Sequence, residues 1–148
     1  VGGHCIAVDP WFLISSFPEE SKLIQKARHT NLNKTDWCLK KINQEIKKFK
    51  KLNKRYPIIS CMGITYKPDV KDTRESPSRK IALELLKNKK IKTLVCEPNL
   101  DKDPVIKFLN LTDCYKKSDI VIWLVGHQEF IKFERDPKKI EIDFCEIN

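Results

Sequence analysis

The sequence lacks any apolar run near the roughly 20 residues that cross a bilayer, which excludes a membrane-spanning helix. Its first residues have no basic flank, apolar stretch and small-residue cleavage pattern, so they are not a secretory signal. It also lacks internal repeats and low-complexity segments. Because the chain does not begin with methionine, we expect it to be a piece of a longer polypeptide.

Closely spaced cysteines are absent as well, since no two of the six lie within five residues of each other. This spacing excludes a zinc knuckle, and we expect no metal site. A chain of 148 residues can bury a core without disulfides, so a reducing cytoplasm is the compartment we expect. Cys61, Cys96 and Cys145 lie in apolar, strand-like segments, which favours inert packing roles.

Two kinds of binding motif are missing. The chain contains neither Gly-x-Gly-x-x-Gly nor Gly-x-x-x-x-Gly-Lys-Ser/Thr, so it has no dinucleotide fingerprint or P-loop. No recognised nucleic-acid motif accompanies its formal net charge of +9. The densest basic stretch, residues 40–55, also carries apolar residues at helical spacing, which are Ile42, Ile46, Phe49 and Leu52. We interpret its lysines as the solvated face of an amphipathic helix, with nucleic-acid binding as the weaker alternative.

The first 55 residues show helical signals and no strand signal. Ser16-Phe17-Pro18-Glu19-Glu20 predicts a helix start, with proline in the first turn and two carboxylates at the positive end of the helix dipole. We expect this helix to run to about Asn31. A second helix is expected from Thr35-Asp36 to residue 53, because Tyr56-Pro57 stops it.

From residue 56 the pattern changes to alternating strands and helices. Strands are expected at residues 58–66, 91–96, 119–125 and 140–145, and helices after Ser76-Pro77 and at residues 113–117 and 128–133. The resulting fold class is α/β, with a helical N-terminal segment followed by a Rossmann-like parallel sheet that has helices on both faces. The expected domains are residues 1–55 and 56–148.

One candidate site lies in Val1-Gly2-Gly3-His4-Cys5-Ile6-Ala7-Val8-Asp9-Pro10. Two adjacent glycines allow backbone amides to approach a ligand closely. A thiol beside them, near a helix N-terminus, can become a nucleophile, and Asp9 could hold or activate a water. The residues alone leave open the alternative that Cys5 is a buried structural cysteine. His4 is adjacent to Cys5, which favours a structural role for its side chain.

The second candidate site is the segment from Gly63 to Pro77, which leaves the first sheet strand and enters the next helix. Open α/β sheets bind ligands at this position. Lys67 and Arg74 bracket the loop and could bind a phosphate together with the helix N-terminus. A solvated loop with incidental charges is the alternative.

Together, Gly2-Gly3-His4-Cys5-Ile6-Ala7-Val8-Asp9-Pro10-Trp11-Phe12-Leu13, Gly63-Ile64-Thr65-Tyr66-Lys67-Pro68 and Asp72-Thr73-Arg74-Glu75-Ser76-Pro77 closely resemble the UDP-glucose/GDP-mannose dehydrogenase family. The resemblance covers essentially the whole chain. It implies the C-terminal part of a cytoplasmic, homodimeric, NAD-dependent enzyme that oxidises the C6 alcohol of a UDP-sugar to an acid, as in bacterial surface polysaccharide synthesis.

The resemblance also implies residue roles. Cys5 would be the nucleophile that forms a thiohemiacetal and then a thioester, and Asp9 would help to activate water. The backbone of Val1, Gly2 and Gly3 would line the UDP-sugar. Lys67 would contact this substrate, and Arg74 would reach NAD, which is otherwise bound by an N-terminal domain upstream of Val1.

Two positions depart from the commonest family pattern. Many members have serine before the cysteine and lysine before the aspartate, where this chain has His4 and Val8. This version is most similar to the branch that oxidises UDP-N-acetyl-D-mannosamine. Another UDP-hexosamine or UDP-glucose is the alternative substrate. A non-catalytic module that binds sugar nucleotides or dimerises, with Cys5 as a relic, is the alternative function.

Overall fold

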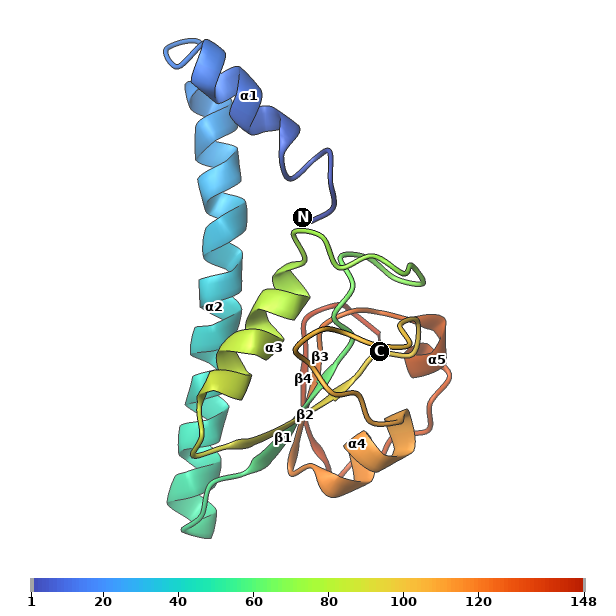
Figure 1. The fold of residues 1–148 in the computed structure, drawn as a ribbon. Coiled ribbons are helices and arrows are strands. Elements are labelled where there is room, and N and C mark those ends of the chain that lie inside the picture. Colours follow the sequence, from blue (N-terminus) through green and yellow to red (C-terminus); the bar gives the residue numbers. More distant parts are fainter. Residues whose placement is uncertain (1, 148) are drawn as a thin grey trace.

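The structure is a computed structural model that describes residues 2–147, with two N-terminal helices followed by a four-stranded sheet (Figure 1). The helices are α1 (Asp9–Ser16), α2 (Lys22–Asn53), α3 (Pro77–Lys87), α4 (Leu111–Lys117) and α5 (Gln128–Ile131). The strands are β1 (Ile58–Met62), β2 (Lys92–Cys96), β3 (Ile120–Trp123) and β4 (Ile140–Asp143). Within the described residues, no helix combines the length and apolar character that a membrane span requires.

All strand pairs are parallel, and the strand order is β2-β1-β3-β4. The chain moves from β1 to β2 on one side and then crosses to β3 on the other side of β1. The carboxyl ends of these three strands are level, since Met62 pairs with both Cys96 and Trp123. The loops that follow β1 and β3 therefore meet at a topological switch point, where open α/β sheets bind ligands.

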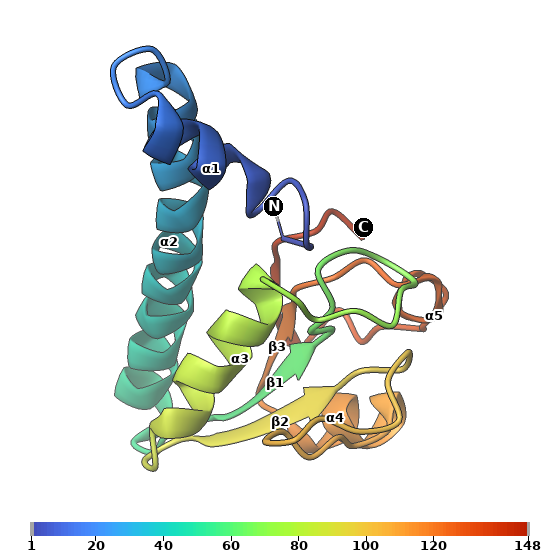
Figure 2. The ribbon, with the colours of Figure 1, turned by 45° about the horizontal axis from the view of Figure 1, so that its top comes forward.

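Helices cover both faces of the sheet, as Figure 2 shows for α2 and α3 on one side and α4 on the other. Alternate residues of each strand point to opposite faces of the sheet and belong to two separate hydrophobic cores. One core joins the sheet to α2 and α3 through residues that include Ile42, Ile59 and Ile122. The other joins the opposite face to α4 and α5 through residues that include Cys114, Trp123 and Phe130. The expected α/β fold with a doubly covered parallel sheet is confirmed.

The expected break between residues 31 and 35 is wrong, because α2 is one continuous helix of 32 residues. Neither proline nor glycine occurs in this stretch. Buried side chains continue along one helix face on both sides of it, at Arg28, Thr35, Cys38 and Ile42. Tertiary burial along a single stripe thus overrides the weak helix propensity of the local asparagine and threonine residues.

The expected helix start at Ser16 is also wrong, because Ser16 is the last residue of α1. Helix α1 begins instead at Asp9, with Pro10 in its first turn, which is an N-terminal signal of the same kind. Residues 17–21 form the turn that leads into α2. Figure 1 shows α1 folded back beside the N-terminal part of α2, away from the sheet.

The basic stretch at the end of α2 has the expected amphipathic arrangement. Its lysines are exposed, whereas Ile42, Ile46 and Phe49 are buried against the sheet. Leu52 departs from the expectation because it is 80% exposed. It lies in the last helical turn, beyond the final core contact at Phe49.

Gly63 lies directly after β1, and its substitution tests how tightly the backbone packs at this point. Its φ is +87°, and a Cβ would lie 2.6 Å from Cβ of Val125. Gly63→Ala should lower the free energy of unfolding by about 2–4 kcal/mol, through left-handed backbone strain and overpacking. Gly126→Ala is the control, since its Cβ would meet a flexible side-chain end, Cγ2 of Ile147, at 3.0 Å. Equal urea midpoints for the two variants would contradict this account.

Candidate functional site

The loop of residues 63–76 connects β1 to α3 and is closed by its own hydrogen bonds. The Tyr66 amide donates to the Asp72 carbonyl at 3.1 Å, and the Ser76 amide donates to the Thr73 carbonyl at 3.1 Å. The Ser76 hydroxyl donates to the Ile64 carbonyl at 2.7 Å and accepts the Arg79 amide at 3.2 Å. The expected N-cap and N1 proline of α3 are confirmed, and Ser76 also ties the two ends of the loop together.

A buried carboxylate, that of Glu97, lies beneath this loop. Its Oε2 accepts the amides of Ile64 at 2.7 Å and Thr65 at 3.2 Å, and its Oε1 accepts the amide of Asn99 at 3.0 Å. Burial alone would raise the pKa of Glu97, but hydrogen bonds from His127 and from the Ile64 and Asn99 amides lower it below its usual value. Glu97 is therefore an ionised anchor for the start of the loop.

His127 completes this anchor and is fully buried. Its Nδ1 accepts the Asp69 amide at 3.0 Å and lies 2.9 Å from Nδ2 of Asn99. An Nδ1 that accepts backbone N–H leaves the ring proton on Nε2, which lies 3.2 Å from Oε2 of Glu97. His127 thus holds the middle of the loop, at Asp69, to the ends of β2 and β3.

Glu97 and His127 were not among the residues singled out from the sequence. Each follows a buried strand at the edge where ligand-binding loops converge, with Glu97 directly after β2 and His127 shortly after β3. A charged or polar residue at the carboxyl end of a predicted parallel strand is the signal that could have identified them.

Lys67 and Arg74 lie on the loop as expected, but in different surroundings. The Lys67 side chain is exposed, and its Nζ lies 5.6 Å from the Tyr66 ring centroid. Arg74 binds Asp72 through Nε at 3.1 Å and Nη2 at 2.7 Å, and Nη2 also lies 3.2 Å from Nδ1 of His4. Of these two cations, Lys67 makes no ion pair within the described residues, whereas Arg74 is partly engaged.

Asp72 and Arg74 form the strongest exposed ion pair of the loop. Hydrogen bonds from the Arg74 side chain and amide hold the pKa of Asp72 at about 2. The same pair raises the pKa of Arg74, with smaller contributions from Tyr66 and Cys5. Cys5 therefore lies within electrostatic reach of Arg74.

The glycine turn packs directly on this loop. The Gly3 amide donates to the Arg74 carbonyl at 3.0 Å. A Cβ on Gly2 would lie 2.6 Å from the Glu75 carbonyl oxygen, so only glycine allows this approach. The contact brings together two segments that are about 70 residues apart in the chain. Val1, the third residue expected to line the substrate, lies outside the described residues.

Cys5 and Asp9 frame the start of α1. The Cys5 carbonyl accepts the amides of Val8 at 2.9 Å and Asp9 at 2.8 Å. The thiol of Cys5 is exposed, so the alternative of a buried structural cysteine does not fit. Asp9 is exposed in the first turn of the helix, four residues from the thiol.

The remaining five cysteines differ from Cys5 in exposure. Cys38, Cys61, Cys96 and Cys114 are buried, and Cys145 is partly buried. Burial raises the pKa of both the Cys61 and the Cys145 thiols to about 12. Burial and a raised pKa both disfavour reaction at Cys61 and Cys145, whereas Cys5 is the one exposed cysteine among the six.

Residues 60–145 match the model of the UDP-glucose/GDP-mannose dehydrogenase family, UDP binding domain. The chain is 40% identical to UDP-N-acetyl-D-mannosamine dehydrogenase of Campylobacter jejuni, covering 98% of this chain and 35% of that protein. It is 37% identical to NDP-N-acetyl-D-galactosaminuronic acid dehydrogenase of Ralstonia nicotianae, covering 92% of this chain and 32% of that protein.

Solved structures agree with these relatives. The UDP-D-ManNAc dehydrogenase of Pyrococcus horikoshii superposes with a TM-score of 0.79 at 26% identity, covering 100% of this chain and 35% of that one. The chain thus spans about a third of the length of the curated relatives it matches. Because the family model matches more than half of its residues, the chain belongs to the UDP-glucose/GDP-mannose dehydrogenase family.

Proposed function

We propose that this chain is the UDP-sugar-binding part of an NAD-dependent UDP-sugar 6-dehydrogenase that converts UDP-N-acetylmannosamine to UDP-N-acetylmannosaminuronic acid for bacterial surface polysaccharide. The observation that carries the proposal is the packing of the Cys5 turn on the β1–α3 loop, through the 3.0 Å hydrogen bond from Gly3 to Arg74. This contact places the turn that carries the exposed Cys5 beside the loop that carries the exposed Lys67.

Each group has a distinct task in binding. The Lys67 ammonium contacts the UDP-sugar, and the backbone of the Gly2-Gly3 turn lines the sugar nucleotide. Arg74 contacts NAD through Nη1, which has no hydrogen-bond partner among residues 2–147. The rest of the NAD surface is assigned to the two thirds of the relatives' length that this chain does not span, because the chain has no glycine fingerprint.

NAD, when bound, accepts a hydride in each of two oxidations at the sugar C6. Between them, the Cys5 sulfur adds to the aldehyde carbon and the thiol proton passes to the carbonyl oxygen, which gives a thiohemiacetal. The second oxidation removes hydride and the hydroxyl proton and leaves a thioester. Water, with Asp9 accepting its proton, adds to the thioester carbon. The C–S bond then breaks, the acid leaves, and the Cys5 thiol is restored.

The identity of the sugar is the part of the proposal for which a relative suggests an alternative. A relative at 37% identity bears the name NDP-N-acetyl-D-galactosaminuronic acid dehydrogenase, so other N-acetylated hexosamines are the first substrates to compare. Direct competition between UDP-N-acetylmannosamine, UDP-N-acetylgalactosamine and UDP-glucose for the same site ranks them.

Two features of the chain support the oligomeric state and the compartment that we propose for the enzyme. Helices α1 and α2 and the turn between them expose Phe12, Phe17 and Leu23, which are 68%, 57% and 82% exposed. We assign this helical segment to a homodimer interface. All six thiols are free, which suits a reducing compartment, and we place the reaction in the cytoplasm.

Lys67→Ala should weaken UDP binding to residues 1–148 by about 1.5–3 kcal/mol, the range for a hydrogen bond to a charged group, or roughly 10–150-fold in Kd. Lys71→Ala is the matched control, because Lys71 is an exposed lysine on the same loop. Isothermal titration calorimetry with UDP measures both variants. Equal affinities would show that the loop is solvated surface.

Alkylation of Cys5 by iodoacetamide should slow when UDP-N-acetylmannosamine is bound, because the sugar covers the thiol. At a ligand concentration 100 times Kd, the rate should fall by up to about 100-fold. UDP without the sugar should protect less. Mass spectrometry of the labelled peptide, with Cys5→Ser as the unlabelled control, gives the rates. Unchanged labelling with calorimetrically bound ligand would favour the non-catalytic module.

Residues 1–148 alone should form no detectable NADH from UDP-N-acetylmannosamine and NAD. Hydride transfer requires NAD within near-attack distance of C6, and misplacement by about 1 Å already costs roughly 10²-fold. Absorbance at 340 nm is recorded with the chain alone and after adding the NAD-binding part of a relative in trans. Rescue should produce the uronic acid, and Cys5→Ala should abolish it. Sustained NADH formation by the chain alone would overturn this division of labour.

A further inference from the structure

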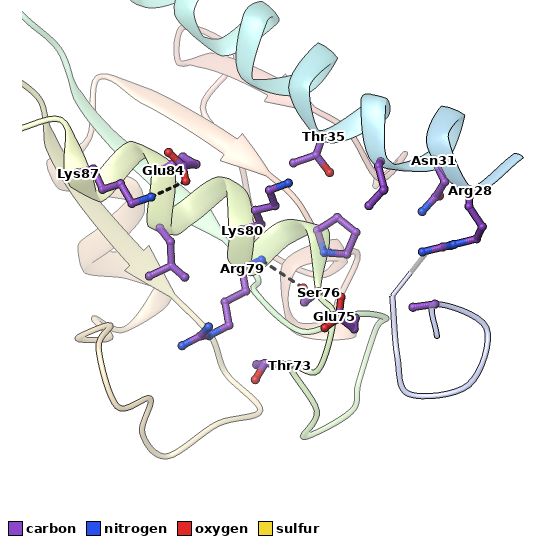
Figure 3. A pocket seen from close by; sticks show the side chains of 14 residues that line it. Arg28, Asn31, Thr35, Thr73, Glu75, Ser76, Arg79, Lys80, Glu84 and Lys87 are labelled. Carbon is purple, nitrogen blue, oxygen red and sulfur yellow. Dashed lines mark hydrogen bonds and ion pairs between the residues drawn. The ribbon is translucent and has the colours of Figure 1, made fainter. Parts of the chain in front are cut away.

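A cavity of about 380 Å³ lies between α2, α3 and the end of the β1–α3 loop. Figure 3 shows its walls, with Arg28, Asn31 and Thr35 on α2 facing the loop that carries Thr73 and Glu75. None of the four side chains given roles above, Cys5, Asp9, Lys67 and Arg74, lines this cavity. It is therefore a separate feature of the fold.

Arg28 is the unusual residue in its wall. It is only 8% exposed, and its Nε is buried without a hydrogen-bond partner among residues 2–147. Its one contact of note is the Trp11 ring, whose centroid lies 6.0 Å from the guanidinium carbon. Arginine stays protonated in proteins, so this site holds a largely buried positive charge without a carboxylate partner among residues 2–147, which is costly.

The other four arginines of the chain have carboxylate partners within 4.0 Å. The pairs are Arg55 with Asp119 at 2.7 Å, Arg74 with Asp72 at 2.7 Å, Arg79 with Asp103 at 2.8 Å and Arg135 with Glu141 at 3.8 Å. Arg28 has no such partner among the described residues. Arg28 is also the most buried of the five arginines, so it is the one for which an unpaired charge costs most.

The rest of the cavity wall does not supply that counter-ion. Of its two carboxylates, Glu84 is bound to Lys87 at 2.6 Å, and Glu75 is an exposed residue that makes no ion pair with Arg28 within 4.0 Å. Helix α3 begins in this wall at Pro77, so the positive end of its dipole lies beside the space. The hydroxyls of Thr35 and Thr73 add hydrogen-bond donors.

We propose that this cavity is an oxyanion site in which Arg28 is the counter-ion of a small phosphate or carboxylate ligand. The guanidinium fork of Arg28 offers donors suited to the oxygens of such a group, and the positive end of the α3 dipole favours its negative charge. The volume of about 380 Å³ has room for a small organic anion as well as inorganic phosphate. Both sources share the same chemistry, and a titration with each distinguishes them.

The test uses residues 1–148 with UDP at saturation, so that any phosphate site of the proposed UDP-sugar surface is already filled. Calorimetric titrations with inorganic phosphate and with succinate should show binding of at least one of them to the unmodified chain. Arg28→Met should weaken that binding about tenfold or more, whereas Arg28→Lys should retain part of it. Lys40→Met, which removes an exposed charge from the same helix, should leave it unchanged.

A second readout guards against misfolding of the variants. The bound anion should raise the urea midpoint of the unmodified chain and of Lys40→Met, but not that of Arg28→Met. Binding of neither anion, or equal binding by Arg28→Met, would overturn the proposal. Failure of UDP binding, or its insensitivity to Lys67→Ala, would instead count against the function proposed above, because Arg28 plays no part there.

Discussion

The structure around the candidate site depends on one buried carboxylate, Glu97, which collects hydrogen bonds from the ends of three strands. It accepts two amides at the exit of β1, one amide at the exit of β2 and the ring of His127 after β3. A buried ion is tolerable only when its acceptor sites are filled in this way. The parallel pairing makes this possible, since it brings the three carboxyl ends level.

The contacts that start at Glu97 determine the positions of the β1–α3 loop and of the glycine turn that packs on it. His127 holds the Asp69 amide, Ser76 joins the loop end to its beginning, and the closed loop presents Lys67 to solvent. The glycine turn then packs on the far part of the loop, where a side chain on Gly2 would collide with Glu75. An exposed nucleophile candidate and a free cation are thus placed by backbone contacts and not by interactions of their own side chains.

Local signals account for most of what could be predicted from the sequence. The order of strands and helices after residue 56 and the Ser76 cap depend on residues within a few positions of each other. The continuity of α2 does not depend on such local signals, because it rests on burial of Thr35 against other elements. The Glu97–His127 pair spans 30 residues, so no local pattern reveals it. The residues alone left Cys5 as either a nucleophile or a buried structural cysteine, and its exposure removes the second interpretation.

The segment from Asp72 to Ser76 belongs to two surfaces at once. Arg74 faces Asp72 and His4 beside the Cys5 turn, whereas Thr73, Glu75 and Ser76 line the cavity that contains Arg28. The segment forms a turn, in which the Ser76 amide donates to the Thr73 carbonyl and Glu75 has a φ of +49°, so its side chains point to different sides. An anion held by Arg28 and the start of α3 would therefore touch the same short segment whose carbonyl, at Arg74, receives the Gly3 amide. The buried charge of Arg28 and the placement of the Cys5 turn are linked through five residues of backbone.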